Sequence, residues 1–183
     1  FANDRLVWID PVTNEARDVH IPVRDTPGTG DFSSYISQEM PESSLYWGDD
    51  LIWNNPGNPH NPMMDGQGRI WMTHQVRGPG NPAWCQEGST NRFARHYPLA
   101  RAARHVAYYD PNTEAVELID TCFNTHHLQF GFEDSERLYL SSVGPVIGWL
   151  DVEVYEDTGD AQAAQGWCPV IVDTNGDGQI TEW

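Results

Sequence analysis

The sequence predicts an all-β fold. Its 183 residues include 16 glycines and 13 prolines, spread along the whole chain, while runs of helix-forming residues are scarce. Glycine and proline punctuate strands and turns, so this composition favours a series of short hairpins. With 39% hydrophobic residues and 8 tryptophans, the chain can build a packed core. Its length indicates one domain, residues 1–183.

Two kinds of hairpin recur along the chain. The first has an apolar run, an aspartate, a polar turn and an alternating strand: "WIDPVTNEARDV" at 8–19, "YYDPNTEAVELI" at 108–119 and "IVDTNGDGQITEW" at 171–183. The second is also strand, turn and strand: "NPMMDGQGRIWMTH" at 61–74 and "LQFGFEDSERLYLSS" at 128–142. Turns rich in Pro, Asn, Asp and Gly between apolar runs are typical of antiparallel pairs.

Regular repetition of four-stranded units is the signature of a β-propeller. The hairpins would form about two to three four-stranded blades, whereas a propeller closes with about four to eight. We therefore expect a single partial β-propeller domain, completed by remaining blades from absent sequence or from another chain. Three stretches rich in Gly, Pro, Ser and Asp, at 20–57, 75–104 and 143–167, are expected to be long loop inserts.

The charge distribution limits the partners of the protein. The net charge is −17, and all ten cationic side chains are arginine. Such a surface repels nucleic acid and anionic lipid, and no apolar run approaches the roughly 20 residues of a membrane span. Residues 77–105, by contrast, carry five arginines against Glu87 alone, a net charge of +4. These arginines either pair with the acidic surface or dock an anionic group or an acidic protein partner. The docking candidates are Arg92, Arg95, Arg101 and Arg104.

Histidines flank the hairpin at 60–74. His60 and His74 lie at equal distances from Gln67 at the centre of the turn, so we expect them to face each other, with Cβ atoms about 4.5–5.5 Å apart. The next hairpin has His126 and His127 at the same point. Because adjacent strand residues point to opposite faces, only one of His126 and His127 can face the central channel of the propeller, and the register favours His127. Three imidazoles suit Zn, Cu, Fe or Ni.

Three interpretations of these histidines stay open. His60, His74 and His127 form a metal site at the channel mouth, or they cap strand ends by bonding to backbone and water. In the third, His74 or His60 acts as a metal-free general base or ligand-binding group.

A second cation site is a candidate near the C-terminus. Asp173, Asn175, Asp177, Gly178 and Thr181 occupy positions 1, 3, 5, 6 and 9 of an EF-hand-type loop. The glutamate of position 12 would fall at residue 184, one past the last residue of the sequence. Calcium bound here would be structural. The alternative is a plain hairpin turn.

The three cysteines predict one disulfide. A bond between Cys85 and Cys122 would stabilise the fold by roughly 3 to 4 kcal/mol in the chain-entropy picture. It would also pin the 75–104 insert over the channel mouth. Cys168, in "GWCPVIV", is expected to be a buried free thiol. The sequence has no haem-attachment motif and no nucleotide-binding motif.

The motifs "GRIWMTH", "HVAYYDPNTEAVELID" and "QITEW" resemble the repeats of the streptogramin lyase (virginiamycin B lyase) type of propeller. That resemblance implies a lyase with a His base and Mg²⁺ at the channel mouth. This chain departs from it, because His74 and Ser142 stand where the repeats carry the glutamate that suits magnesium. "NPHNPM", "DTCFNTHHLQFG" and "DTNGDG" resemble large exported bacterial propeller proteins of unknown function, some described as carboxypeptidase regulatory-like.

Together these observations predict a periplasmic or extracellular bacterial binding or scaffold module with a divalent metal at a channel-mouth histidine site. The alternative is a lyase or hydrolase that uses His74 or His60 as general base.

Overall fold

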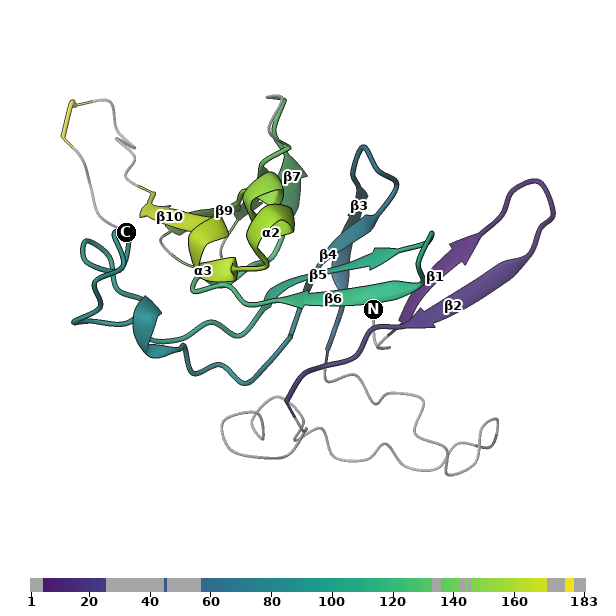
Figure 1. Ribbon diagram of the computed structural model, residues 1–183, viewed down its shortest axis with the longest axis horizontal. Helices are drawn as coiled ribbons and strands as arrows, with labels where there is room; N and C mark the ends of the chain where they lie inside the picture. The colour runs from purple at the N-terminus through teal and green to yellow at the C-terminus, as the bar shows by residue number, and fades with distance from the viewer. Residues whose placement is uncertain are drawn as a thin grey trace.

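The computed structural model describes residues 5–25, 45, 57–132, 136–141, 144, 146–170 and 177–179. Antiparallel strands dominate this part of the chain, which confirms the all-β prediction. They form one two-stranded sheet and two four-stranded sheets (Figure 1). Among these residues, no helix has the length and apolar character needed to cross a membrane.

In each sheet, strands that follow one another in sequence are neighbours. The N-terminal hairpin contains β1 (Arg5–Ile9) and β2 (Ala16–His20). The central sheet contains β3 (His60–Met64), β4 (Ile70–His74), β5 (His105–Asp110) and β6 (Ala115–Ile119). The C-terminal sheet contains β7 (Leu128–Phe130), β8 (Leu138–Ser141), β9 (Val146–Leu150) and β10 (Gln165–Pro169). The described residues also contain three short helices, η2 (Ala83–Cys85), α2 (Val152–Thr158) and α3 (Ala161–Ala164).

In the first kind of hairpin, an aspartate side chain closes the turn. The Asp10 carboxylate accepts a hydrogen bond of 2.7 Å from the backbone N–H of Val12, and Asp110 accepts one of 2.8 Å from Asn112. These bonds hold the pKa of both carboxyls below the usual value and close turns typical of aspartate. The predicted hairpins at 8–19 and 108–119 are therefore confirmed. Of the third, at 171–183, only residues 177–179 are described.

The prediction that 143–167 is a loop was wrong. This stretch contains β9, α2, α3 and the start of β10. The strands β9 and β10 complete the C-terminal sheet. The outer half of that sheet thus comes from residues 146–169. Of the 20–57 insert, the structure describes only residues 20–25, 45 and 57.

Two glycines explain why the outer strands of the C-terminal sheet resemble loops in sequence. A Cβ on Gly148 would lie 2.2 Å from the Phe123 ring, and one on Gly166 would lie 2.3 Å from Trp149. Both positions therefore lack a side chain because aromatic rings occupy the space. Between the two strands, α2 begins at Val152, and the preceding Asp151 caps it by accepting a hydrogen bond from the N–H of Val154.

The central sheet is covered on both faces. Trp71 and Val106 point into a core shared with the C-terminal sheet, which also contains Leu138 and Trp167. The next residues along β4 and β5 pack on the opposite face in a second core with the N-terminal hairpin, whose contributors include Leu6, Val19, Ile21, Met72 and Ala107. The described strands therefore form three layers that follow the order of the chain. The N-terminal hairpin (purple) and the C-terminal sheet (green to yellow) lie on either side of the central sheet (Figure 1).

The 75–104 insert is anchored by a disulfide and a buried arginine. Cys85 and Cys122 are bonded, as predicted. The Arg77 guanidinium pairs with Asp120 at 2.8 Å and donates to four further oxygens, those of Gly78, Gly80, Asn81 and Thr121. Cys168 has a free thiol but is exposed, so the prediction of burial was wrong: on β10 its neighbour Trp167 takes the buried face.

Candidate metal centre

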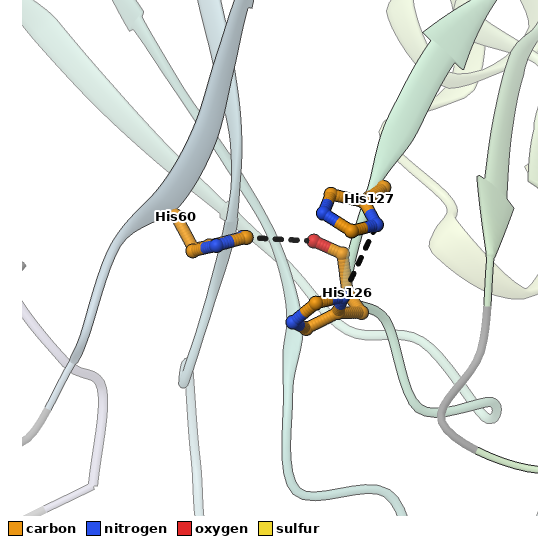
Figure 2. Close-up of side chains that lie close together, drawn as sticks. All are labelled: His60, His126 and His127. Atoms are coloured by element: carbon orange, nitrogen blue, oxygen red, sulfur yellow. Dashed lines mark hydrogen bonds between the residues drawn. The ribbon is translucent and has the colours of Figure 1, made fainter.

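Three histidines converge where the central and C-terminal sheets meet. His60 begins β3, whereas His126 and His127 immediately precede β7. Each of the three imidazoles has a ring nitrogen that lies within 4.8 Å of a ring nitrogen of the other two. Figure 2 shows the His60 ring reaching across from β3 towards the other two rings.

The backbone of His126 sets the tautomer of His60. His60 Nδ1 lies 3.2 Å from the His126 carbonyl oxygen. A carbonyl oxygen only accepts, so Nδ1 carries the proton and donates, and the lone pair resides on Nε2. Metal-binding histidines usually donate their second ring N–H to a carbonyl or carboxylate in this way, which orients the ring and raises its basicity.

His126 and His127 already have the spacing of two ligands on one ion. Their Nδ1 atoms are 3.1 Å apart, and their rings meet edge to face with centroids at 4.1 Å. Two nitrogens bound tetrahedrally at about 2.0–2.1 Å from zinc would lie about 3.3 Å apart. In the metal-free pair one nitrogen must donate its proton to the other, and a bound cation would take the place of that proton.

His126 belongs to the cluster although the sequence favoured His127 alone. The alternation of side chains holds inside a strand, but β7 begins only at Leu128. Residues 126 and 127 lie in the bend before it, where consecutive side chains can turn to the same side. The two residues are nevertheless well fixed, because the N–H of His126 donates to the Ser141 carbonyl at 2.9 Å and that of His127 donates to Ser141 Oγ at 3.1 Å.

Side chains of the central sheet hold the same segment. Thr73 Oγ1 donates to the His126 carbonyl at 2.9 Å, and the N–H of Leu128 donates to Asn61 Oδ1 at 2.8 Å. The histidines of the two sheets are thus kept together by hydrogen bonds that do not involve their metal-binding nitrogens.

The predicted pairing of His60 with His74 is wrong. Met63 pairs with Trp71 as the expected register requires, but an irregularity between Met63 and His60 leaves His60 opposite Thr73. Asn61, inside this bulge, has a φ of 52°. A shift of one residue moves a side chain to the other face of the sheet. His74 therefore points away from His60.

His74 is a core residue. Its side chain is fully buried, and its Nε2 donates to the Pro22 carbonyl at 2.8 Å. Burial lowers its pKa to about 4; the Pro22 bond opposes this shift, and the nearby Arg104 and His20 add to it. His74 pairs across the sheet with His105, which is also buried and whose pKa burial holds well below the usual value. A ring with a pKa of about 4 is a weak base, and without solvent access it is unsuited to general-base catalysis.

The other predicted site residues are distributed as follows. Asp173 and Asn175 of the calcium candidate lie outside the described residues, and Asp177 accepts a turn bond of 2.8 Å from the N–H of Gln179. Calcium binding stays a prediction. The docking candidates separate into the exposed Arg92, Arg95 and Arg101 and the half-buried Arg104.

Arg104 is hydrogen-bonded to residues next to the clustered histidines. Its Nη1 donates to the Asn58 carbonyl at 2.6 Å, two residues before His60. Its backbone N–H donates to Asn124 Oδ1, and its carbonyl accepts from the N–H of Thr125, next to His126. Several features of these surroundings lower the pKa of His126. Desolvation is the largest cause, and electrostatic repulsion by His127, His60 and Arg104 follows in that order. A lowered pKa favours the neutral form of the ring, which is the form that binds metal.

The cluster has the chemistry of an open metal site. Three imidazoles leave a fourth position for water or a ligand on a tetrahedral ion, and one of the three, His127, is exposed. Comparison of the chain with family models, curated proteins and solved structures yields no match.

Proposed function

We propose that this protein binds a divalent transition metal through His60, His126 and His127. The observation that carries the proposal is the convergence of three imidazole nitrogens within 4.8 Å from two different sheets. Imidazole suits Zn²⁺, Cu²⁺, Fe²⁺ and Ni²⁺. The donor set contains no carboxylate, which argues against Mg²⁺ and Ca²⁺ at this position.

We further propose that the central and C-terminal sheets are consecutive blades of a β-propeller, with the N-terminal hairpin as the outer half of the preceding blade. Two four-stranded sheets with strands in sequential order support this. So does the close approach of their first strands, β3 and β7, which would border the central channel. The metal site would then lie at the channel mouth, and absent sequence or another chain would supply the remaining blades.

The Cys85–Cys122 bond supports a periplasmic or extracellular location, because disulfides persist in oxidising compartments. In this proposal the protein is an exported binding or scaffold module, and the metal orders the contact between two blades.

The test is metal binding by the purified protein. Metal-free protein is titrated with Zn²⁺ and with Ni²⁺ by calorimetry, and bound metal is counted by elemental analysis. We expect one equivalent, with affinity reduced at least about a hundredfold in His126→Ala and His127→Ala, since each removes a ligand from a set of three. His96→Ala, an exposed histidine of the insert, is the matched control. Equal binding by all four proteins would refute the site.

A second candidate function is hydrolysis or elimination with a metal-bound water as the base. It is favoured by the open fourth position, because three-histidine zinc sites lower the pKa of bound water to about 7. His60 is the remaining candidate for a metal-free base. Zinc-loaded protein, the His127→Ala variant and free zinc are compared on an activated ester, 4-nitrophenyl acetate. Hydrolysis by the variant or by free zinc at the rate of the loaded protein would exclude the enzyme.

A further inference from the structure

Arg104 differs from the other arginines that the fold withdraws from water. Four arginines in the described part of the chain are buried or half-buried, and three have a carboxylate partner: Arg69 with Asp65, Arg77 with Asp120 and Arg137 with Asp151. Arg104 has no ion pair with any described acid. Burial alone lowers its pKa, with no opposing contribution from a carboxylate. A partly desolvated cation without a counter-ion is costly unless something else supplies the charge.

The position of Arg104 indicates what supplies that charge. Its guanidinium bonds to the backbone two residues before His60, and its own backbone bonds to Thr125 next to His126. One Nη1 hydrogen is used by the Asn58 carbonyl, whereas a guanidinium has five N–H donors in a planar fork. Arg104 therefore stands beside the histidine cluster with donors to spare.

We infer that the site takes an oxyanion, the carboxylate or phosphate group of a small ligand, held between the metal at His60, His126 and His127 and the guanidinium of Arg104. The inference deepens the proposed metal function and rests on it. A divalent cation on three neutral imidazoles next to a guanidinium gives a local charge of about +3. The donor set contains no acid to neutralise it.

The chemistry selects oxyanions for two reasons. Carboxylate and phosphate oxygens bind the open position of a divalent metal, and they match the guanidinium fork with charge-assisted hydrogen bonds. The chain as a whole has a net charge of −17, which repels extended polyanions. Small molecules with one oxyanion group fit the site better than nucleic acid.

The experiment uses Co²⁺ as a spectroscopic probe. Co²⁺-loaded protein is titrated with acetate and, separately, with inorganic phosphate, and the visible absorption of the metal reports ligand exchange at its open position. We expect saturable changes with at least one of the two anions. In Arg104→Gln the affinity should fall by at least about tenfold, because one charge-assisted contact is lost, while the Co²⁺ stoichiometry stays unchanged.

Two further variants make the result specific. Arg92→Gln, an exposed arginine of the same insert, should bind the anion as the wild type does. Arg104→Lys keeps the charge but not the fork and should bind between the wild type and Arg104→Gln, provided circular dichroism shows that it is folded. Equal anion affinity in the wild type and in a folded Arg104→Gln or Arg104→Lys would overturn the inference.

Failure of the metal site is distinguishable from failure of this inference. If the protein takes up Co²⁺ but neither anion changes its spectrum, the metal proposal stands and the oxyanion inference falls. If it takes up no Co²⁺, the metal proposal falls, and the metal-free protein is titrated with phosphate by calorimetry. Binding that depends on Arg104 would keep the anion site without the metal, and absence of binding would remove both.

Discussion

Thr73 donates its hydroxyl to the backbone carbonyl of His126 at a distance of 2.9 Å. This bond joins β4 of the central sheet to the segment that carries two of the three clustered histidines. The same carbonyl accepts the Nδ1–H of His60. The carbonyl thus sets both the position of the segment and the tautomer of the third histidine, and it links the packing of the sheets to the geometry of the candidate metal centre.

Thr73→Val should weaken metal binding although it removes no ligand. The hydroxyl is buried, and its loss leaves the His126 carbonyl with His60 as its partner. We expect about 1 kcal/mol less stability and a loss of metal affinity of about tenfold or more, as for other groups that orient ligands. Calorimetric titration with Zn²⁺ measures it.

The control is Thr73→Ser, which keeps the hydroxyl and should retain most of the affinity. If the valine variant binds Zn²⁺ as tightly as the wild type, the bond to His126 does not position the site.

Much of the fold could be predicted because its signals are local. The hairpins at 8–19 and 108–119 close on Asp10 and Asp110, whose side chains bond to the next turn residues and need no distant partner. The strands β9 and β10 could not be predicted in this way. Gly148 and Gly166 are conformationally permissive in sequence, and only the packing of Phe123, Trp149 and Phe93 explains them.

The site was predicted in part for a related reason. The proximity of His60 and His127 can be predicted from the sequence because strand ends of adjacent hairpins lie close together in a fold of this kind. His74 was wrongly included because the register calculation assumes an unbroken pair, and the bulge at Asn61 depends on contacts with the next sheet, including the bond from Leu128. Strand alternation does not predict the role of His126, because this residue lies two positions before β7 begins at Leu128.

Metal binding should weaken with falling pH, and His126 should be a ring that resists protonation. Protons compete with the metal for the ring nitrogens, so affinity falls as the cluster protonates. Desolvation above all, followed by the proximity of His127, His60 and Arg104, holds the pKa of His126 below 6.5. This ring therefore stays neutral when an unperturbed histidine would be half charged. Histidine proton resonances of the metal-free protein, followed between pH 4 and 8, should give a midpoint for His126 below 6.5. A midpoint at or above that value would contradict the environment described here.

The disulfide should contribute to stability and to the site. Cys85 and Cys122 are separated by 37 positions, for which the chain-entropy model gives about 4 kcal/mol. Cys122 lies four residues before His126, and the insert that it anchors ends at Arg104. We expect a Cys85→Ser, Cys122→Ser double variant to unfold at lower urea concentration and to bind Zn²⁺ less tightly.

Cys168→Ser is the matched control, since that thiol is free and exposed. It should change neither the urea midpoint nor the affinity. Peptide mapping without reductant should recover Cys85 and Cys122 in one linked pair, and recovery of Cys85 as a free thiol would contradict the bond.

The buried His74 should make the protein sensitive to acid. Its pKa is about 4 in the folded state, through burial above all, and about 6.5 in the unfolded chain. Between these values the unfolded state binds more protons, so the stability is fully present above pH 6.5 and is lost as pH falls towards 4. The difference corresponds to about 3 kcal/mol. Urea unfolding of the metal-free protein at pH 4 to 8 measures this slope.

His74→Gln separates the titration from the packing. Glutamine has an amide N–H to offer the Pro22 carbonyl but cannot take up a proton. The His74 ring packs directly on Gly57, where an added Cβ would lie 2.0 Å from it, and glutamine fills this space less well. The variant should therefore be somewhat less stable at pH 8, and its stability should depend less on pH between 4 and 6.5. A residual slope is expected from His105, which is buried in the same way. His96→Gln, at an exposed position, should keep the wild-type profile. An unchanged slope in His74→Gln would mean that this ring is not held neutral in the folded protein, and the argument that excludes it as a general base would fail with it.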